Sequence, residues 1–424
     1  MRTGHRQRKG ALQSCSSGFS EIIEAPCLSK LFEEAARRDT AVYRRTPDEE
    51  LLALGVAREF PEADDLPSGG RQIFWRAFDG GLDRGQGEWD RFERNYRYVP
   101  QAILLRRTNQ PKTRVLAVSQ AAWRRWESLG EPGSTGAEET TSDLVEATSH
   151  LLDEDRFRQA VRRIIDEKAL PKAVIARRLR QQTNSPPSLT GILDRLASDY
   201  ATCTTFALSP GESLFPTFVG ATPERLVAVE EGRLSTMALA GTVGGDALED
   251  RQRAERGLLE STKDREEHRF VRDMIADALA PHCVDLNAPE TPGILRLSNV
   301  SHLHTPIEGR LKDDAAFFDV VDALHPTPAV CGTPREEARQ FIRRHEDFDR
   351  GLYAGVLGWA DGRGDGEADV LLRAALIDES GATLYAGAGI TADSDVDAEW
   401  EETTQKFRPL LDALGCGSDR GSDE

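Results

Sequence analysis

The 424-residue sequence has no run of about 18 consecutive apolar residues, so it predicts no membrane-spanning helix. Lysine is scarce, since eight of the 54 basic residues are Lys and the others are Arg. The formal charge of −18 repels phosphate backbones and anionic lipid, which argues against nucleic acid or a membrane as a partner. The six cysteines are scattered without a CxxC pair, which excludes a zinc ribbon and indicates a reducing compartment.

Several signals and catalytic motifs are also absent. The first twenty residues lack the apolar core of a secretion signal, so we expect a cytoplasmic protein, with a transit peptide as the alternative for this basic segment. There is no P-loop, no dinucleotide-binding fingerprint and no G-x-S-x-G motif. His302 and His304 have strand spacing, but no third soft ligand stands at a spacing suited to zinc. The turn DGRGDG at 361–366 has Arg where a calcium loop needs an oxygen.

The chain divides at a polar stretch, residues 127–142, which indicates a surface linker. We expect a disordered tail over residues 1–24, and another over 415–424 where Gly, Ser and Asp dominate. Residues 25–142 then form a variable N-terminal part of the same domain. Residues 143–414 form its C-terminal core, which begins with a helix.

The C-terminal core has the clearer pattern. Alternation of apolar and polar residues predicts three strands over Phe215–Val243 and three antiparallel strands over Tyr353–Ile390. We expect a helix from about Ala254 to Ala280 and a last one from near Ser394 to Leu414. A T-P-R-E capping box at 333–336 predicts the start of another helix at Thr333. Meandering strands with long helices between them indicate an α+β fold built on antiparallel sheets.

Two of these helices carry pairs of carboxylates. Asp264 and Glu267 are three residues apart on one helix, and Glu399 and Glu402 repeat that spacing on the last helix, where Lys406 follows. Each set has a plainer interpretation: a solvated charged face, or a surface ion pair contributing about 0.3–0.5 kcal/mol. If the two helices meet, however, their carboxylates supply the oxygen ligands that Mg²⁺ prefers.

Single residues in two strand-like segments suggest acid and base chemistry. Lys172 lies in the apolar run LPKAVIA, where a half-buried amine can serve as a general base, although a lysine that extends to water is equally common there. Glu224 follows Gly and Pro at a strand corner with apolar neighbours. That setting predicts a raised pKa and a general-acid role for Glu224, and a solvent-facing turn residue is the alternative. Gly387 and Gly389 would let a ligand approach the backbone closely.

Together these segments resemble the chorismate-utilising enzymes, the family of anthranilate, aminodeoxychorismate, salicylate and isochorismate synthases. The similar stretches cover roughly the C-terminal 250 residues in family order. They are PKAVIAR (171–177), FVGATPERLV (218–227), ALAGT (238–242), STKDREEH (261–268), SHLHTPIEGRL (301–311), LHPTPAVCGTPREEA (324–338), FDRGLYAGVLGW (348–359), LLRAAL (371–376) and YAGAGITADSDVDAEWEETTQK (385–406).

The resemblance implies a chorismate-binding core around a central cleft and a reversible, Mg²⁺-dependent conversion of chorismate to isochorismate. By motif, Lys172 would activate water for attack at C2, and Glu224 would protonate the departing C4 hydroxyl. The implied metal ligands are Glu267 and Glu402, with Asp264 and Glu399 acting as outer or water-mediated ligands. The implied substrate-binding residues are Tyr353, Arg373, Gly387 and Lys406 for the carboxylates, and Gly241, His302, Thr305 and Ala329 around the ring.

Within the family, the stretch LHPTPAVCGTP is most similar to isochorismate synthases. Lys172 stands where anthranilate synthases carry an amide, which favours water over ammonia as the nucleophile. Ala240 stands where aminodeoxychorismate synthases often carry a nucleophilic Lys, so no glutamine amidotransferase partner is expected. A salicylate synthase, which also eliminates pyruvate, is the alternative enzyme, and a catalytically silent chorismate-binding scaffold is the alternative of another class. We expect a monomer, and menaquinone, siderophore and salicylate biosynthesis all remain open as pathways.

Overall fold

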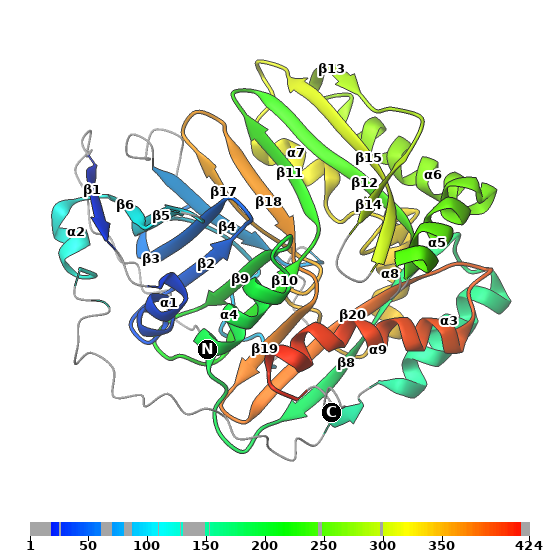
Figure 1. Cartoon of the computed structure of the whole chain (residues 1–424), viewed down its shortest axis with the longest axis horizontal. Helices are drawn as coiled ribbons and strands as arrows, with labels where there is room; N and C mark the ends of the chain where they lie inside the picture. The colour runs from blue at the N-terminus through cyan, green and yellow to red at the C-terminus, as the bar shows by residue number, and fades with distance from the viewer. Residues whose placement is uncertain are drawn as a thin grey trace, which may run out of the picture.

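The computed structural model describes residues 18–24, 27–60, 70–79, 87–108, 110–127, 129, 149–151, 153–244, 248–296 and 300–416. Within these residues the strands form one continuous antiparallel network with two branches, which diverge at β5 (Asn95–Arg107) (Figure 1). Strand β5 can serve both branches because it is 13 residues long. Its first residues pair with β4 and its later residues pair with β6. Strand β3 pairs with β5 along the other edge.

The first branch ends at β8, and we call it the β8 branch. Its strands pair in the order β3 (Glu49–Glu59), β2 (Ala41–Arg45), β9 (Thr204–Ser209), β10 (Thr217–Thr222), β19 (Ala374–Asp378), β20 (Gly381–Ile390) and β8 (Lys172–Gln182). Two short strands pair with β8, namely β7 (Ser149–Leu151) and β16 (Gly332–Thr333). Beyond β5 lie β6 (Lys112–Ala117) and β1 (Phe19–Glu24).

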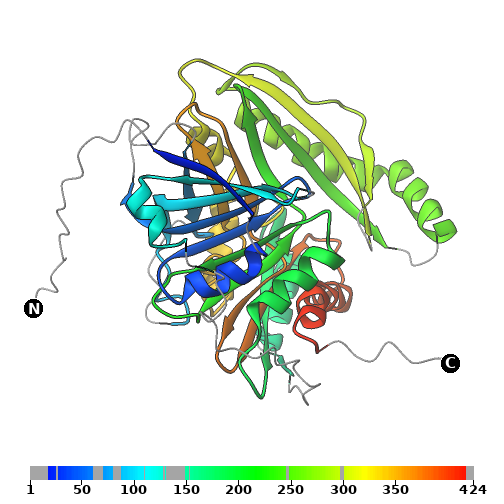
Figure 2. The same cartoon turned by 60° about the vertical axis from the view of Figure 1, so that its left-hand side comes forward.

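The second branch ends at β15, and we call it the β15 branch. Its strands pair in the order β4 (Arg71–Arg76), β17 (Val356–Asp361), β18 (Gly366–Val370), β11 (Arg225–Glu230), β12 (Arg233–Gly244) and β15 (Val300–Leu311). Strands β13 (Cys283–Asn287) and β14 (Gly293–Arg296) pair with β15. Figure 2 shows the long β12–β15 pair extending away from the β8 branch.

The chain crosses between the branches at two neighbouring turns. Strands β10 and β11 are consecutive in the sequence but belong to different branches. The same is true of β18 and β19. The backbone amide of Val370 donates to the carbonyl of Glu224 at 2.9 Å, and the amide of Ala221 donates to the carbonyl of Arg373 at 3.2 Å. These hydrogen bonds fix the two turns, which carry Glu224 and Arg373, at the place where the branches separate.

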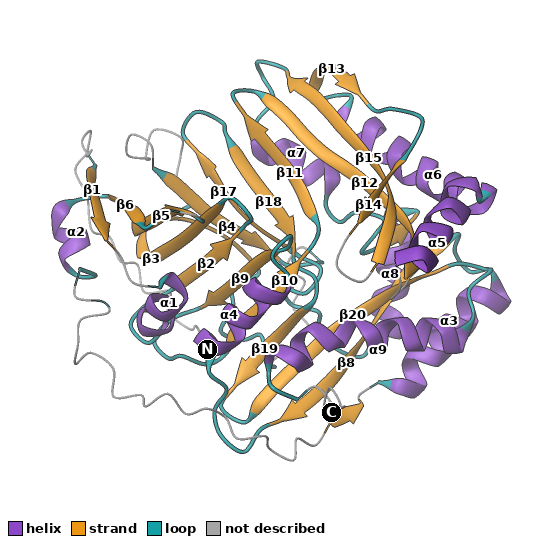
Figure 3. Ribbon diagram, in the orientation of Figure 1, coloured by secondary structure: helices purple, strands orange, loops and turns teal. Residues whose placement is uncertain are grey.

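Helices cover both branches (Figure 3). Beside the β8 branch lie α1 (Leu28–Ala36), α3 (Glu154–Glu167), α4 (Leu189–Asp199), α8 (Arg335–His345) and α9 (Val396–Ala413). Against the β15 branch lie α5 (Leu248–Glu260), α6 (Thr262–Leu279) and α7 (Phe317–Leu324), and α2 (Gln120–Arg124) contacts β5 and β6. No helix in these described ranges has the length and apolar character needed to cross a membrane.

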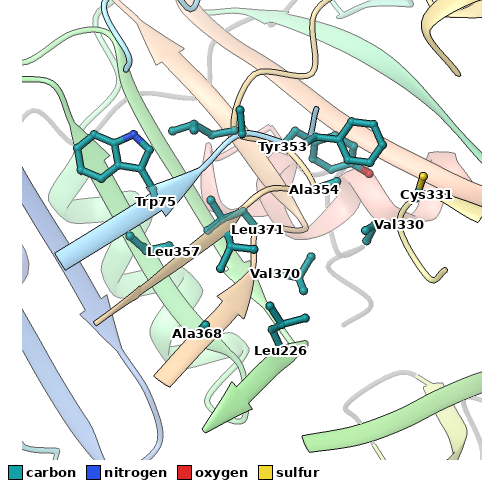
Figure 4. Packing of buried hydrophobic residues seen from close by; sticks show 14 of the residues in the cluster. Trp75, Leu226, Val330, Cys331, Tyr353, Ala354, Leu357, Ala368, Val370 and Leu371 are labelled. Carbon is teal, nitrogen blue, oxygen red and sulfur yellow. The ribbon is translucent and has the colours of Figure 1, made fainter. Parts of the chain in front are cut away.

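Apolar side chains from both branches pack into a shared core. Trp75, Leu226, Leu357 and Val370 are each at most 3% exposed and lie close together (Figure 4). Most strands of the network are buried on both faces, because helices or the other branch cover each side. In β10, for example, all six residues are buried. The core therefore holds the two branches in a fixed relation around the crossing turns.

The predicted α+β fold with antiparallel sheets is confirmed, with differences at particular elements. The helix expected from Ala254 to Ala280 is two helices, because Ser261 caps a new N-terminus by accepting a hydrogen bond from the amide of Asp264. Tyr353–Ile390 contains four strands rather than three, because the chain turns at Arg373, whose φ is +47°. Thr333 is not a helix cap, since it pairs with Lys172 as part of β16 and α8 begins at Arg335.

One difference concerns the boundary of the N-terminal tail. Residues 19–24, expected within a disordered tail, form β1, because every residue of this segment pairs with β6. The helix expected near Asp143 lies outside the described residues, and the next helix that is described, α3, begins at Glu154. Most of the expected linker at 127–142, and the tails before residue 18 and after residue 416, lie outside the described residues.

Candidate active site

Lys172, the expected base, is the first residue of β8. Its ammonium donates a hydrogen bond to Glu267 Oε1 at 3.0 Å, and the side chains are 15% and 36% exposed. A Cβ on Gly389, which lies on the adjacent strand β20, would come within 2.9 Å of Lys172 Cε. The absence of a side chain at Gly389 therefore gives the lysine the room to reach α6.

Lys406 makes a second lysine–carboxylate pair across the same end of the sheet. Its ammonium lies 2.7 Å from Glu402 Oε1 on α9 and donates to the carbonyl of Gly387 at 2.9 Å. The i,i+4 spacing on one helix brings Glu402 and Lys406 together, as the sequence predicts. The contact with Gly387 fixes α9 against β20 and directs the ammonium toward the sheet.

The carboxylates of α6 and α9 are neighbours. The pKa of Glu399 is raised, first by burial and then by the negative charges of Glu402 and Glu267. Asp264 lies on the same helix as Glu267, and a Cβ on Gly241 would meet its Cβ at 3.4 Å. Yet among the described residues no group of three or more His, Cys, Asp or Glu side chains stands ready to hold a metal ion. Two of the four carboxylates are instead occupied by lysines.

Glu224 lies at the crossing turn between β10 and β11. Burial raises the pKa of its carboxyl to about 7, against the opposing effects of Thr327, Lys172 and Lys406. Thr327 Oγ1 is at the hydrogen-bond limit, 3.5 Å from Glu224 Oε1. The influence of both lysines on its pKa shows that Glu224, Lys172 and Lys406 share one neighbourhood.

A small cavity opens beside Glu224, between the β15 branch and helices α6 and α7. Apart from Glu224 its lining is largely apolar, and it includes Ala329 and Thr327 as well as Leu239 and Val271. Ala329, expected to contact a substrate ring, therefore does lie next to the expected acid. Apart from its place in the stretch LHPTPAVCGTP, no pattern in the sequence predicts a role for Thr327.

The remaining expected ring contacts come from β12 and β15. The register between these strands shifts between Ala240 and Thr242, where Gly241 has a φ of +68° that favours glycine. His302 hydrogen-bonds the backbone of Gly241, and burial lowers the pKa of its imidazole. Thr305 is fully buried, and its hydroxyl lies 2.8 Å from Nε2 of His268, a buried neighbour of Glu267 that the sequence analysis did not select.

Tyr353 and Arg373 approach from the β18–β19 side. Tyr353 is buried with its ring stacked on Tyr385, 5.4 Å between centroids, and a Cβ on Gly387 would lie 3.2 Å from its hydroxyl. Arg373 is half-buried, and its charge contributes to the lowered pKa of His302. In the described part of the chain no hydrogen bond or ion pair occupies the Arg373 guanidinium. Among the residues that the structure describes, the Arg373 guanidinium therefore has no protein partner, whereas the two lysines of the site are paired.

The geometry brings the expected site residues into one region at the junction of the branches. The base, the acid and the carboxylates come from β8, the β10–β11 turn, α6 and α9, and the ring contacts come from β12 and β15. The arrangement combines a lysine, a carboxyl that holds its proton near neutral pH, and several cations. These groups can move protons on an anionic substrate.

Comparison with known proteins supports this description. A family model described as chorismate binding enzyme matches residues 69–415. Isochorismate synthase MenF of Bacillus subtilis is 35% identical over 357 residues, which cover 80% of this chain and 73% of that protein. A salicylate biosynthesis isochorismate synthase of Pseudomonas aeruginosa is 44% identical over 53% of this chain and 47% of its own length.

Solved structures give the same result. The menaquinone-specific isochorismate synthase MenF from Escherichia coli has a TM-score of 0.77 and 25% identity, covering 95% of this chain and 96% of that chain. An anthranilate synthase component I from Streptococcus pneumoniae, at 19% identity and a TM-score of 0.66, shares the fold. The family expected from the sequence motifs is confirmed, and the chain belongs to the chorismate-binding enzymes.

Proposed function

We propose that this protein is an isochorismate synthase that converts chorismate reversibly to isochorismate with the help of Mg²⁺. The observation that carries the proposal is the shared neighbourhood of Lys172 and Glu224, a lysine and a carboxyl whose pKa is about 7. The relatives named as isochorismate synthases, among them one 35% identical over 80% of this chain, support it.

The reaction needs one proton taken and one proton given on the substrate ring. With Lys172 in its neutral form, water loses a proton to the amine as its oxygen bonds to C2, and the ring double bonds shift. Glu224 gives its proton to the C4 hydroxyl, which leaves as water. One water enters and one leaves, so atoms and charge balance, and proton exchange with solvent returns both side chains to their starting state. A carboxyl with a pKa of about 7 holds its proton at neutral pH and can still release it.

The substrate is a dianion, which the site receives with cations in a protein of net charge −18. Arg373 would bind one carboxylate through its guanidinium, since its planar fork matches a carboxylate. Lys406, the Tyr353 hydroxyl and the backbone at Gly387 would hold the other. The ring would then lie against His302, Thr305, Gly241 and Ala329.

The carboxylates of α6 and α9 fit a hard divalent cation. Their oxygens are the donors that Mg²⁺ prefers. Burial first, and then the negative charges of Glu402 and Glu267, raises the pKa of Glu399, and a bound cation would oppose that shift. Glu267 and Glu402 would hold the metal, with Asp264 and Glu399 as outer or water-mediated ligands. When bound, Mg²⁺ would neutralise charge on a substrate carboxylate. Its entry has to displace or share the contacts of Glu267 with Lys172 and of Glu402 with Lys406.

Product analysis tests the proposal. The protein is incubated with chorismate and Mg²⁺, and the products are separated by chromatography; a second sample contains EDTA. We expect isochorismate in equilibrium with chorismate, and none in the EDTA sample. Salicylate with pyruvate would instead identify a salicylate synthase, and an unchanged chorismate peak would reject both enzymes. Activity that persists with EDTA would reject the metal alone.

A further inference from the structure

Arg177 on strand β8 is a fully buried cation that the proposed chemistry does not use. Within the described residues no carboxylate forms an ion pair with it, and its Nη1 atom makes no hydrogen bond. Burial lowers the pKa of its guanidinium to about 10, which still leaves it charged at neutral pH. Burying a charge without a counter-ion is costly, so the contacts that remain must hold it firmly.

Among the described residues, the hydrogen bonds and cation–π contacts of the Arg177 guanidinium all go to helix α9. Its guanidinium donates to Thr403 Oγ1 at 2.7 Å, to Thr404 Oγ1 at 2.5 Å and to the carbonyl of Trp400 at 3.1 Å. Its Cζ atom lies 3.6 Å from the ring centroid of Trp400 and 4.8 Å from that of Phe407. One side chain of β8 therefore holds almost two turns of α9 by hydrogen bonds and cation–π contacts.

The two turns that Arg177 holds are those that carry the site. Glu399, Glu402 and Lys406 alternate along α9 with the residues that contact Arg177. Farther along, Pro409 lies inside the helix and has no amide to donate to the carbonyl of Gln405. The first half of α9 is thus joined less firmly to the second half, and it depends on its own contacts for its position.

Arg177 also belongs to the strand that carries Lys172. The two residues are five positions apart, and side chains alternate along a strand, so Lys172 and Arg177 leave β8 on opposite faces. The same strand thereby directs the expected base to α6 and holds α9 with the expected carboxylates. A well-packed apolar residue at this position would avoid the desolvation free energy of a buried charge. A guanidinium, by contrast, makes directional hydrogen bonds that hold the helix in one register.

We propose that Arg177 is a positioning residue that fixes the first half of α9 against β8 and so sets Glu399, Glu402 and Lys406 relative to Lys172. Its effect on turnover rests on the proposed function, but its effect on the helix does not. Removal of the fork loosens residues 396–406 more than residues 410–414, and it weakens the binding of Mg²⁺ without removing any group that touches the substrate.

Two variants of the full chain separate this role from a general loss of stability. Arg177→Gln removes the charge and most of the fork, and Leu410→Ala makes a cavity in the same helix beyond Pro409, where Leu410 is 1% exposed. Amide hydrogen exchange along α9 is measured without metal or substrate, and Mg²⁺ binding is measured by calorimetry. Arg177→Lys, which keeps the charge but loses the planar fork, is the conservative comparison.

We expect Arg177→Gln to speed exchange of residues 399–406 at least tenfold, to weaken Mg²⁺ binding at least tenfold and to lower kcat. Arg177→Lys is expected between Arg177→Gln and wild type, and Leu410→Ala within twofold of wild type in Mg²⁺ affinity. Equal exchange in both halves of α9 in Arg177→Gln, or the same exchange profile in Leu410→Ala, overturns the proposal. If the wild type binds no Mg²⁺, the exchange contrast still decides the role of Arg177, and only the metal in the proposed function fails.

Discussion

Two charged regions of this molecule contact β8: the Arg350–Glu346 pair and the candidate site. They differ in how completely their charges are paired. Arg350 and Glu346 are buried, and the guanidinium donates to Glu346 and to the carbonyls of Val330 and Val174. In the candidate site, by contrast, the Arg373 guanidinium and the Glu224 carboxyl have few partners among the described residues: Arg373 has none, and Glu224 has one long contact, with Thr327. We call a charged pair saturated when protein groups fill its hydrogen-bonding positions. Saturated pairs stabilise a fold, whereas incompletely paired groups remain available to a ligand.

The lysine pairs of the site stand between these extremes. Lys172 with Glu267, and Lys406 with Glu402, are short pairs, but each is partly exposed and joins two groups assigned to different tasks. Partly exposed pairs contribute little to stability, about 0–1 kcal/mol, so they can be exchanged for a substrate carboxylate or a cation at small cost. The contrast with Arg350 predicts that substitutions in the two regions separate activity from stability.

The largest effect is expected at Lys172. Lys172→Ala should lower kcat about 10²–10⁴-fold, the usual contribution of general acid–base catalysis, because the proposed mechanism assigns proton removal from the attacking water to this amine. Its Tm should stay close to that of wild type, because only a partly exposed ion pair is lost. Turnover of chorismate and thermal unfolding are measured on the same preparation. Near wild-type turnover would reject Lys172 as the base.

The saturated pair should respond in the opposite way. Glu346→Gln leaves the buried guanidinium of Arg350 without its counter-ion, which costs about 3–5 kcal/mol of unfolding free energy. Below the lowered Tm, turnover should remain within a few-fold of wild type, since neither residue is among those proposed to bind the substrate or to transfer protons. Denaturant unfolding followed by fluorescence gives the loss. A loss under 1 kcal/mol would mean that the pair is no more stabilising than those of the site.

The pH dependence of Glu224 sharpens the contrast further. Its pKa in the folded protein, about 7, exceeds its ordinary value of 4.5, so the folded state binds the proton more tightly than the unfolded state. Stability is therefore unaffected below pH 4.5 and is lost as the pH rises toward 7, by up to roughly 3 kcal/mol. Glu224→Gln should remove this loss, and wild-type kcat should fall as the pH rises through about 7. Parallel stability–pH curves for the two proteins would contradict the assignment.

How much of this contrast the sequence predicts depends on how far apart the interacting residues are along the chain. The pairs Asp264/Glu267 and Glu399/Glu402 follow from helical spacing, and the raised pKa of Glu224 follows from its apolar neighbours. The contact of Lys172 with Glu267 joins residues 95 positions apart and depends on how α6 docks, which no local pattern encodes. Only the family motifs indicated that these segments meet.

Two features escaped local sequence patterns for identifiable reasons. The turn at Arg373 could not be predicted from the sequence, because almost continuous apolar residues connect β18 with β19. No change of pattern marks the point where the chain crosses between the branches. Arg177 lies in a strand that is apolar from Ala173 to Ala176, where a basic residue ordinarily indicates an exposed strand end. Its burial depends on hydroxyl and aromatic groups of α9, more than 220 residues later.

The smallest of these effects is expected at Arg373, and it tests the meaning of an unpaired charge most directly. Arg373→Lys keeps the positive charge but replaces a planar fork by a single ammonium, so KM for chorismate should rise about tenfold while Tm stays unchanged. Stability is unaffected because the guanidinium has no described protein partner to lose, whereas the equivalent change at Arg350 breaks several hydrogen bonds. Steady-state kinetics and thermal unfolding of both variants measure the difference. If Arg373→Lys lowered Tm as much as Arg350→Lys and left KM unchanged, Arg373 would be a structural cation, and the distinction between saturated and available charges would fail at this residue.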